Sequence, residues 1–363
     1  MKSLIAVVLL LGSALLVLPQ QRPVPEIPFD SVPDFFKLPN DLHFGEGAGV
    51  AVNSKKHIFV FTRGNVTGPA FGATASQLLE FGPDGKYLRE IGRNLYAWAY
   101  AHTVRVDKDD NIWAVDKGSD MVVKFNPAGR VVMVFGRKKE SSDEAAPWTR
   151  VTPPRPPVDG EFRQPTDVTW DLQGNIFISD GYINSRVAKF DKNGDWVKSF
   201  GVPGTNTGQF DTPHSIAADA AGNIYVADRG NFRIQVFDPD GKFLRVMKID
   251  VPVPPDARPW KGPTPTDETV GSQHAGAPWA VCITPGPNQF LYAADAFPGR
   301  IYKMTLDGRI LGVLGRAGKQ PKQFGWIHEI ACPSENELYV AEVVNWRVQK
   351  LILRPEKTQT RGN

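Results

Sequence analysis

A repeat of about forty residues constrains the fold of this chain more than any other feature. Two near-copies, Gln164–Phe190 and Thr212–Phe237, each contain an apolar-alternating stretch, a turn with Gly-Asn, and a second alternating stretch that ends in Asp. In both copies Asn-x-Arg then precedes a third stretch. Alternation of period two, bounded by Gly-Asn turns, is typical of an antiparallel meander. Meanders repeated at this spacing are typical of the blades of a β-propeller.

The pattern occurs six times along the chain. The copies are Gly49–Gly92, His102–Gly136, Gln164–Gly201, Thr212–Ile249, Pro278–Gly315 and His328–Leu353. The last copy stops after its third strand, while a Pro-rich segment, 22–42, precedes the first copy. We therefore expect an all-β, six-bladed propeller over residues 43–354, in which segment 22–42 supplies the missing strand and closes the ring. Such closure leaves no exposed sheet edge.

The two ends of the chain differ from the repeats. Residues 1–21 combine a basic residue with a mostly apolar run from Leu4 to Leu18, which is the order found in a secretory signal peptide and is short for a membrane span. We expect a secreted or periplasmic protein with no stable membrane span beyond this leader. No A-x-A cleavage site is evident, so an uncleaved anchor is the alternative. Residues 355–363 form a polar tail.

Composition excludes some partners. The net charge is +3 and the longest basic cluster is Arg137-Lys138-Lys139. Nucleic-acid binding, which needs a basic surface, is not indicated. We expect a monomer.

The cysteines are Cys282 and Cys332, one position apart in neighbouring aligned repeats. Side chains one position apart along a strand point to opposite faces of a sheet. We therefore expect two buried thiols rather than a disulfide.

One position of the repeat is occupied by histidine in alternate copies. It lies two residues before the first inward apolar residue and holds Ala48, His102, Thr166, His214, Trp279 and His328. Alternate blades of a six-fold ring lie about 120° apart, so the three histidines are expected to converge on the axis. Three neutral imidazoles with one side left open suit a catalytic Zn²⁺. In the alternative interpretation they line the channel and bond to neighbouring backbone, but their threefold repetition favours a metal.

A second position lies at the end of each second strand, after a recurrent acid. It holds Arg63, Lys117, Gly181, Arg229, Ala296 and Val343, and Tyr182 comes next in the third copy. Because this end lies beside the start of the first strand, Arg63, Arg229 and Tyr182 are expected at the same mouth as the histidines. Two guanidinium groups beside a metal predict an anionic substrate, most simply a carboxylate. Each arginine could equally pair with a blade carboxylate, and for Lys117 such a solvated pair is the preferred interpretation.

The other recurrent polar residues are expected to serve the architecture. The acids are Asp116, Asp180, Asp228, Asp295 and Glu342, and three copies add Asn-x-Arg. We interpret them as turn caps and as acid–arginine pairs between strands. Glu329 follows His328 directly and has no acidic counterpart after His102 or His214, so we expect it to support the metal site or to bind calcium.

The segments QPTDV, SDGYINSR, PHS and VADR carry a resemblance to known proteins. From about Gly49 to Leu353 the chain resembles the NHL-repeat propellers and, more narrowly, the peptidyl-α-hydroxyglycine α-amidating lyases. The resemblance implies a zinc ion on His102, His214 and His328, an active-site tyrosine at Tyr182, and substrate-side arginines at Arg63 and Arg229. It also implies a structural calcium held by the backbone carbonyls of Val50 and Val104 and by Glu329.

The chain departs from the family pattern at several of these places. Glu329 replaces an Asp, and Trp326-Ile327 replaces a Met-Pro pair in the pocket wall. Ile183 and Val226 stand where the animal enzymes carry disulfide cysteines.

These features together predict an exported zinc-dependent lyase. It would cleave the C–N bond of a carboxylate-bearing N-(hydroxyalkyl) amide, in the family a peptidyl-α-hydroxyglycine that yields the peptide amide and glyoxylate. Tyr182 would act as general base or orient the proton transfer, and Arg63 would hold the carboxylate. The alternative is a non-catalytic NHL propeller that binds a peptide, glycan or envelope protein at the channel mouth, which leaves the histidines unexplained. A calcium-dependent propeller hydrolase would need acidic and Asn ligands on the axis, and fits the sequence less well.

Overall fold

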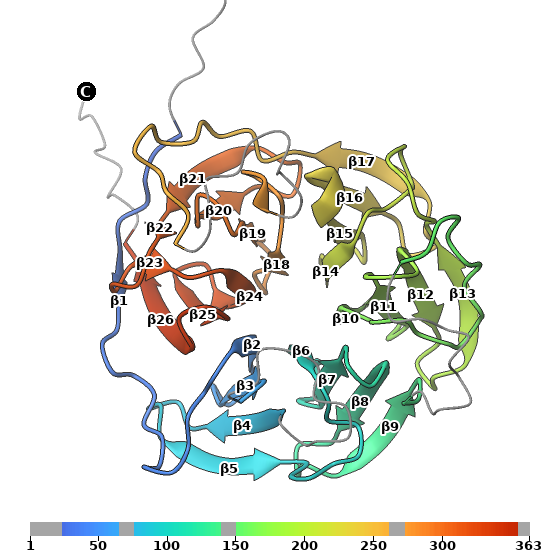
Figure 1. Cartoon of the computed structure of the whole chain (residues 1–363), viewed down its shortest axis with the longest axis horizontal. Coiled ribbons are helices and arrows are strands. Elements are labelled where there is room, and N and C mark those ends of the chain that lie inside the picture. Colours follow the sequence, from blue (N-terminus) through green and yellow to red (C-terminus); the bar gives the residue numbers. More distant parts are fainter. Residues whose placement is uncertain (1–23, 65–75, 139–149, 261–272, 355–363) are drawn as a thin grey trace, which may run out of the picture.

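The computed structural model describes residues 24–64, 76–138, 150–260 and 273–354. These residues form six four-stranded antiparallel sheets around a central axis, so the predicted six-bladed propeller is confirmed (Figure 1). The leader 1–21, the tail 355–363 and the middle of both long connections lie outside the described residues. Within the described ranges, no helix has the length and apolar character needed to cross a membrane.

Each blade runs from an inner strand at the axis to an outer strand at the rim (Figure 1). The inner strands are β2 (Gly47–Val52), β6 (Ala101–Val106), β10 (Asp167–Trp170), β14 (Pro213–Ala218), β18 (Ala280–Ile283) and β24 (Ile327–Ser334). The second strands are β3 (Ile58–Thr62), β7 (Ile112–Asp116), β11 (Ile176–Asp180), β15 (Ile224–Asp228), β19 (Leu291–Ala294) and β25 (Glu337–Glu342). The third strands are β4 (Gln77–Phe81), β8 (Met121–Phe125), β12 (Arg186–Phe190), β16 (Arg233–Phe237), β20 (Ile301–Met304) and β26 (Arg347–Leu353).

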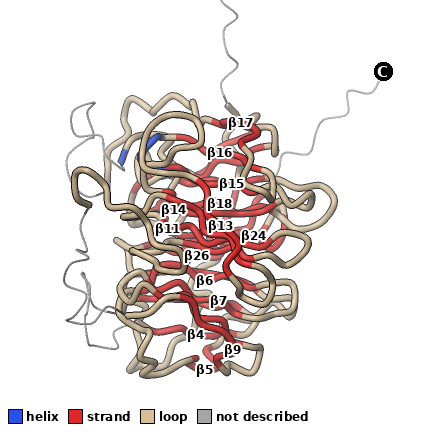
Figure 2. The backbone as a smooth tube through the Cα atoms, turned by 90° about the vertical axis from the view of Figure 1, so that its right-hand side faces the viewer, coloured by secondary structure: helices blue, strands red, loops and turns tan. Residues whose placement is uncertain are grey.

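The outer strands are β5 (Tyr87–Ile91), β9 (Val131–Phe135), β13 (Trp196–Phe200), β17 (Phe243–Met247), β21 (Ile310–Leu314) and β1 (Phe29–Ser31). A short 3-10 helix, η2 (Arg229–Asn231), follows β15, and β22 (Arg316–Ala317) pairs in parallel with β23 (Gln323–Phe324). Figure 2 shows the strands crossing the disc and the loops gathered at its two faces.

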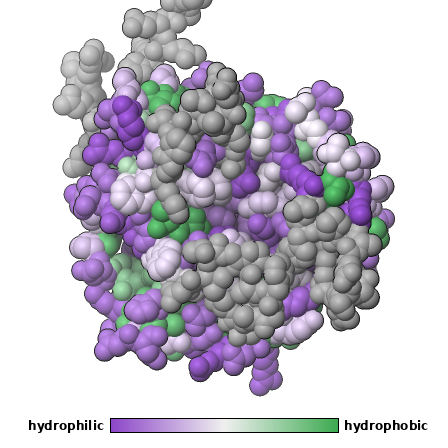
Figure 3. All heavy atoms as spheres, in the orientation of Figure 1, coloured by the Kyte–Doolittle hydropathy of each residue, from purple (hydrophilic) through white to green (hydrophobic). Residues whose placement is uncertain are grey.

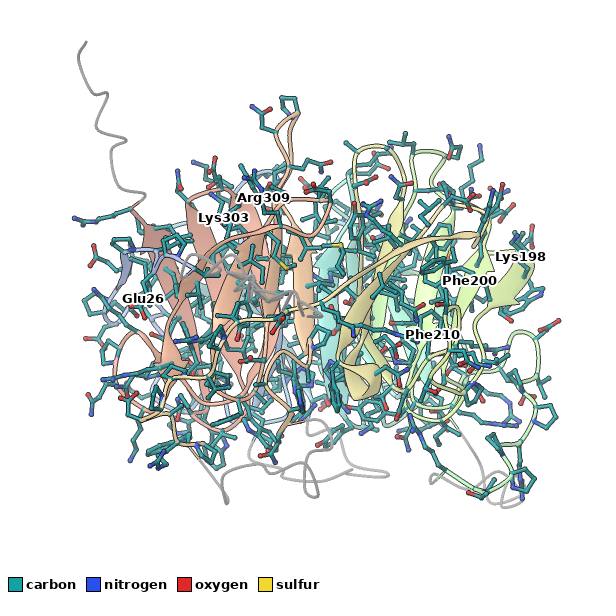
Figure 4. The ribbon with its side chains drawn as sticks, turned by 90° about the horizontal axis from the view of Figure 1, so that it is seen from above. Glu26, Lys198, Phe200, Phe210, Lys303 and Arg309 are labelled. Atoms are coloured by element: carbon teal, nitrogen blue, oxygen red, sulfur yellow. A yellow bond between two sulfur atoms is a disulfide. The ribbon has the colours of Figure 1, made fainter. Side chains whose placement is uncertain are left out.

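The N-terminal segment closes the ring. Strand β1 pairs antiparallel with β26, with Phe29 opposite Leu353. Just before it, the backbone N–H of Ile27 donates to the carbonyl of Val313 in the fifth blade, 2.8 Å away. Glu26 accordingly lies on the side of the disc that carries Lys303, opposite Phe200 and Phe210 (Figure 4). The predicted circular closure is confirmed, and it fastens the last two blades to the start of the propeller.

The core lies between neighbouring blades. Each sheet is covered on both faces by its neighbouring blades. Successive residues of a strand therefore point alternately to the preceding blade and to the following blade, and apolar residues are buried on both sides. Val168 of β10 packs in one cluster with Trp113 of β7, and Val281 of β18 packs with Tyr225 of β15. Over the described residues the outer surface of the face seen in Figure 3 is mainly hydrophilic, with small apolar patches.

Three of the five recurrent acids pair with an arginine of the third strand, as predicted. Arg186 donates through Nε to Asp180 at 3.1 Å, Arg233 to Asp228 at 2.7 Å, and Arg347 to Glu342 at 2.7 Å. The carboxylates also accept from the Asn of each Asn-x-Arg element, for example Asn184 to Asp180 at 2.6 Å. These residues therefore stabilise the blades.

The expectation of two free thiols was wrong. Cys282 of β18 and Cys332 of β24 form a disulfide, with their Cα atoms 6.2 Å apart. The two residues do point to opposite faces of their sheets, but consecutive blades stack face against face. The forward face of the fifth blade and the backward face of the sixth meet in one core cluster, which contains both cysteines. Opposite parity in neighbouring blades therefore brings the two sulfurs together.

Candidate active site

Each of the three predicted histidines sits in a β-bulge of its inner strand. The register of β6 against β7 passes from Ala101 directly to Thr103 and leaves His102 without a paired residue. The same irregularity leaves out His214 on β14 and His328 on β24. A bulge re-aims a side chain away from the regular alternation of the strand. Here the bulges turn the imidazoles towards the axis, where the rings lie with centroids 4.6 to 5.0 Å apart.

The other three blades fix the tautomer of these imidazoles. His102 Nδ1 lies 2.6 Å from the carbonyl oxygen of Thr166, and His214 Nδ1 lies 2.6 Å from that of Trp279. His328 Nδ1 lies 2.7 Å from the carbonyl oxygen of Ala48. A carbonyl only accepts, so each Nδ1 carries the hydrogen and each Nε2 presents its lone pair to the axis. The six equivalent positions thus alternate between an imidazole and the carbonyl that orients it.

The histidine cluster, which is His102, His214 and His328, fits a zinc ion. All three side chains are buried, and their ligand atoms lie within 4.8 Å of one another. Burial lowers the pKa of each imidazole well below its usual value, and the neighbouring arginines add to this effect. Neutral imidazoles whose second nitrogen donates to a backbone carbonyl are a common ligand set for zinc.

Tyr182 lies at the edge of the histidine cluster. Its hydroxyl is 3.2 Å from His214 Nε2 and 3.4 Å from His102 Nε2. The turn that carries it comes close to the next blade, because a Cβ at Gly181 would lie only 2.1 Å from the Pro213 carbonyl oxygen. Burial alone would raise the pKa of Tyr182, but the charges of Lys117, Arg229 and Arg63 together lower it.

The two predicted arginines differ in their partners. Arg63 is buried and already engaged: Nη1 donates to Glu46 at 2.8 Å, Nε to the Ala101 carbonyl at 2.8 Å, and Nη2 lies 3.3 Å from His328 Nε2. Arg229 is equally buried, yet its Nε and Nη1 have no hydrogen-bond partner among the described residues. Its guanidinium carbon lies 4.2 Å from the Trp279 ring centroid. Buried donors without a partner cost free energy, so Arg229 is prepared for an anion.

Comparison with known proteins relates the chain to a repeat family and to several enzymes. Residues 210–237 match the NHL repeat family. The chain is 26% identical over 333 residues to peptidyl-glycine α-amidating monooxygenase A of Xenopus laevis, which covers 83% of this chain and 31% of the relative. It is 28% identical over 210 residues to a probable peptidyl-α-hydroxyglycine α-amidating lyase of Caenorhabditis elegans, covering 53% of this chain and 55% of the relative. This chain is an NHL-repeat propeller that resembles the amidating lyases.

The chain thus spans about a third of the length of the frog relative. A solved streptogramin B lyase superposes on the NHL propeller with a TM-score of 0.54 at 14% identity, covering 90% of this chain and 98% of that one. At this identity the superposition shows the fold alone.

Lys117 belongs to the site, contrary to the expectation of a solvated pair with a blade carboxylate. Its Nζ lies 3.7 Å from the ring centroid of Tyr182 and 5.2 Å from that of Tyr100. Burial lowers the pKa of the lysine. The acid of its own blade, Asp116, accepts instead from the backbone N–H groups of Ala99 and Tyr100. The NHL propeller therefore gathers three cationic side chains around one tyrosine.

Arg150 was not found from the sequence, because it lies in a long connection without repeat pattern. Its Nε donates to the Tyr182 carbonyl at 2.7 Å, Nη1 donates to Asp211 at 2.7 Å, and Nη2 donates to the Thr212 hydroxyl at 2.6 Å. Arg150 thereby ties the tyrosine-bearing turn to the fourth blade of the NHL propeller.

Aromatic rings form the wall on the side of the fifth and sixth blades. The rings of Trp279 and Trp326 lie 5.4 Å apart, and Trp279 lies 4.9 Å from His214. Trp326, which departs from the family pattern, thus widens the apolar wall beside Arg229.

The residues expected to hold calcium lie near one another on inner strands, but Glu329 already has a cationic partner. Val50 and Val104 are buried on β2 and β6. Glu329 Oε1 forms an ion pair of 2.7 Å with Arg105, a residue that the sequence reasoning did not single out. Arg105 could have been found as the charged residue in the VRVD segment of an otherwise apolar inner strand. Calcium at this place stays a prediction.

Proposed function

We propose that this propeller is a zinc-dependent lyase that cleaves the C–N bond of a carboxylate-bearing N-(hydroxyalkyl) amide. One observation carries the proposal: an oriented three-histidine cluster lies beside the buried Arg229, whose Nε and Nη1 have no hydrogen-bond partner among the described residues. The relative from Caenorhabditis elegans, which is named as a probable amidating lyase, supports the same reaction class. The substrate we propose is a peptidyl-α-hydroxyglycine or a small analogue, and the products are the amide and glyoxylate.

The residues divide the work as follows. Arg229, and not Arg63 as expected from the sequence, binds the carboxylate, because Arg63 is already paired with Glu46 while Arg229 Nε and Nη1 have no partner among the described residues. Arg63 completes the cationic side of the site. A bound zinc ion would act as Lewis acid and lower the pKa of the substrate hydroxyl. Tyr182, beside two of the histidines, takes the hydroxyl proton and returns a proton to the amide nitrogen as the C–N bond breaks. The C–N bond that breaks and the C=O bond that forms in glyoxylate account for all atoms and charges, so the reaction needs no oxidant.

We also propose that the protein acts outside the cytoplasm as a monomer. The Cys282–Cys332 disulfide supports export, because disulfides persist in oxidising compartments.

The test is metal content followed by turnover. We expect about one zinc per chain in the wild type and loss of zinc in His102→Ala, His214→Ala and His328→Ala. His43→Ala, which changes an exposed histidine, serves as the matched control. Zinc-loaded wild type should release glyoxylate from α-hydroxyhippurate, and the cluster variants should not. A folded, metal-replete wild type that holds no zinc would overturn the proposal in favour of a propeller that binds a peptide, glycan or envelope protein.

A further inference from the structure

A second charged cluster lies on the axis next to the histidine cluster. Its centre is the Arg105 guanidinium on β6. Nε donates to Asp167 Oδ1 at 2.9 Å and Nη2 donates to Asp167 Oδ2 at 2.6 Å. Nη2 also lies 2.7 Å from Glu329 Oε1, and all three side chains are largely or fully buried. We call Arg105, Asp167, Ser215 and Glu329 the axial cluster.

The axial cluster joins the inner strands of five blades. Arg105 comes from the second blade and Asp167 from the third. Ser215 of the fourth blade donates to Asp167 Oδ2 at 2.8 Å and lies 3.2 Å from Arg105 Nη2. The Val281 carbonyl of the fifth blade lies 3.2 Å from the same nitrogen, and Glu329 belongs to the sixth.

The first blade meets this axis through its backbone. Gly49 of β2 approaches β6 so closely that a Cβ on it would lie 2.6 Å from the Val104 nitrogen. The Arg105 guanidinium thus contacts residues of four other inner strands, and the remaining inner strand, β2, packs against its own strand β6. A ring of strands needs such a tie, because inner strands of different blades share no ladder of backbone hydrogen bonds.

The resemblance to the amidating lyases places a structural calcium on Val50, Val104 and Glu329, which belong to the same part of the axis. In this chain the Glu329 carboxylate is instead engaged by a fixed cation. We propose that the Arg105 guanidinium replaces that calcium ion structurally, so that a side chain of the propeller itself links the inner strands around the axis. This inference does not depend on the proposed lyase activity.

The chemistry of the two cations explains why they exclude one another. A guanidinium is planar and always charged, and its fork matches a carboxylate in bidentate geometry, as with Asp167. Calcium needs six to eight oxygen ligands and would have to sit beside the positive charge of Arg105. The site is within reach of ions, because a pocket of about 340 Å³ at the other mouth of the channel is lined in part by Arg105.

Removing the guanidinium should recreate a metal site. Glu329 Oε2 is buried and has no hydrogen-bond partner among the described residues. Without Arg105, Glu329 would also lose its ion pair, and the Asp167 carboxylate, which accepts in addition from Val168 N–H and Ser215, would face the same space. Arg105→Ser leaves a small polar side chain in place of the cation. We expect this variant to acquire calcium binding that the wild type lacks.

The experiment uses zinc-loaded full-length protein in buffer depleted of calcium on a chelating resin, with Ca²⁺ then added. Calorimetric titration and thermal unfolding are measured in parallel. Wild type should bind no calcium stoichiometrically and keep its Tm. Arg105→Ser should unfold at lower temperature without calcium, bind about one Ca²⁺ per chain, and regain roughly 4 °C at a calcium concentration of about 100 Kd. Arg105→Ser/Glu329→Gln should bind calcium more weakly than Arg105→Ser.

Two results would overturn the inference. One is saturable binding of calcium to the wild type with a rise in Tm that Glu329→Gln abolishes. The other is an Arg105→Ser protein that is as stable as wild type without calcium. If Arg105→Ser does not fold, the wild-type titration alone decides, since it needs no variant. Zinc content and glyoxylate release are measured separately, so failure of the lyase proposal is distinguishable from failure of this one.

Discussion

The Nδ1 atom of His214 lies 2.6 Å from the carbonyl oxygen of Trp279, one blade further round the ring. The acceptor is a backbone atom, so the side chain at that position can have a different role. The Trp279 ring packs against the Arg229 guanidinium. The same holds for Ala48 and Thr166, whose carbonyls orient the other two histidines. The threefold arrangement of the histidines is therefore built on six positions, of which only three need a fixed side chain.

Replacing Arg229 should reduce turnover of carboxylate substrates specifically. In Arg229→Met the charge is lost while much of the side-chain volume stays, so we expect kcat/KM for α-hydroxyhippurate to fall by about 10- to 100-fold, the range for a charge-assisted hydrogen bond. The analogue with its carboxylate converted to a primary amide should be affected little. Equal losses on the acid and the amide would assign Arg229 to another role. Arg63→Met also leaves Glu46 without its arginine partner, so it should reduce turnover of both substrates.

Lys117 should contribute charge rather than structure. We expect Lys117→Met to raise KM for the anionic substrate by about 3- to 10-fold, because one of three cations near Tyr182 is removed. Thermal stability should be unchanged or higher, since a charged amine no longer has to be buried. Lys117→Arg should keep KM near the wild-type value, and Lys108→Met, at an exposed position, is the matched control. Unchanged KM in Lys117→Met would return this residue to the solvated role first expected of it.

Gly181 should be essential for the position of Tyr182. A Cβ at this residue would meet the Pro213 carbonyl oxygen at 2.1 Å, so the turn of Gly181→Ala must move away from the fourth blade. We expect a loss of stability of about 1–3 kcal/mol, as for overpacking, and a larger proportional loss of kcat than of zinc content. Denaturant unfolding, elemental analysis and steady-state kinetics separate these effects. Full activity in Gly181→Ala would show that Tyr182 does not need its present position.

The disulfide should stabilise the junction between the fifth and sixth blades. It closes a loop with a sequence separation of 50 residues, for which removal of a disulfide costs about 2–4 kcal/mol of unfolding free energy. The double variant Cys282→Ser/Cys332→Ser should show this loss in denaturant titration, and so should wild type under reducing conditions. The reducing agent should not change the stability of the double variant.

Asp295 should make stability fall as pH rises towards neutrality. Burial raises the pKa of this carboxyl to about 7 in the folded protein, and no arginine side chain of its own blade pairs with it as Arg186 pairs with Asp180. The folded state then binds more protons than the unfolded state between about pH 4 and pH 7. The unfolding free energy therefore decreases over that range, by roughly 2 kcal/mol from pH 5 to pH 7, and levels off above about pH 8.

The measurement is denaturant unfolding at pH 5, 6, 7 and 8 of wild type and Asp295→Asn. The amide cannot titrate, so the variant should lose this part of the slope. An identical pH dependence in both proteins would contradict the prediction. Zinc should be kept saturating throughout, so that metal release does not add its own pH dependence.

The sequence by itself determined the blade pattern. Period-two alternation is a local signal that repeats six times, and Gly-Asn turns and acid–arginine pairs recur in some of the copies. Closure by the N-terminal segment followed from a third strand without an outer neighbour. The histidines were also found from the sequence, because they occupy one aligned position in alternate repeats and must therefore lie on one ring. Arg63 and Arg229 were found because they occupy a second aligned position, at the end of the second strand of the first and fourth repeats.

Only the tertiary structure decided how these residues face one another. The Cys282–Cys332 bond, the contact of Lys117 with Tyr182 and the reach of Arg105 to Asp167 and Glu329 all cross between blades. The pattern of a single repeat predicts which face of its own sheet a side chain occupies. It does not predict which face of the neighbouring sheet lies opposite that side chain. The bulges that aim the histidines depend in the same way on packing around the axis, where six strands meet at a distance that no local sequence specifies.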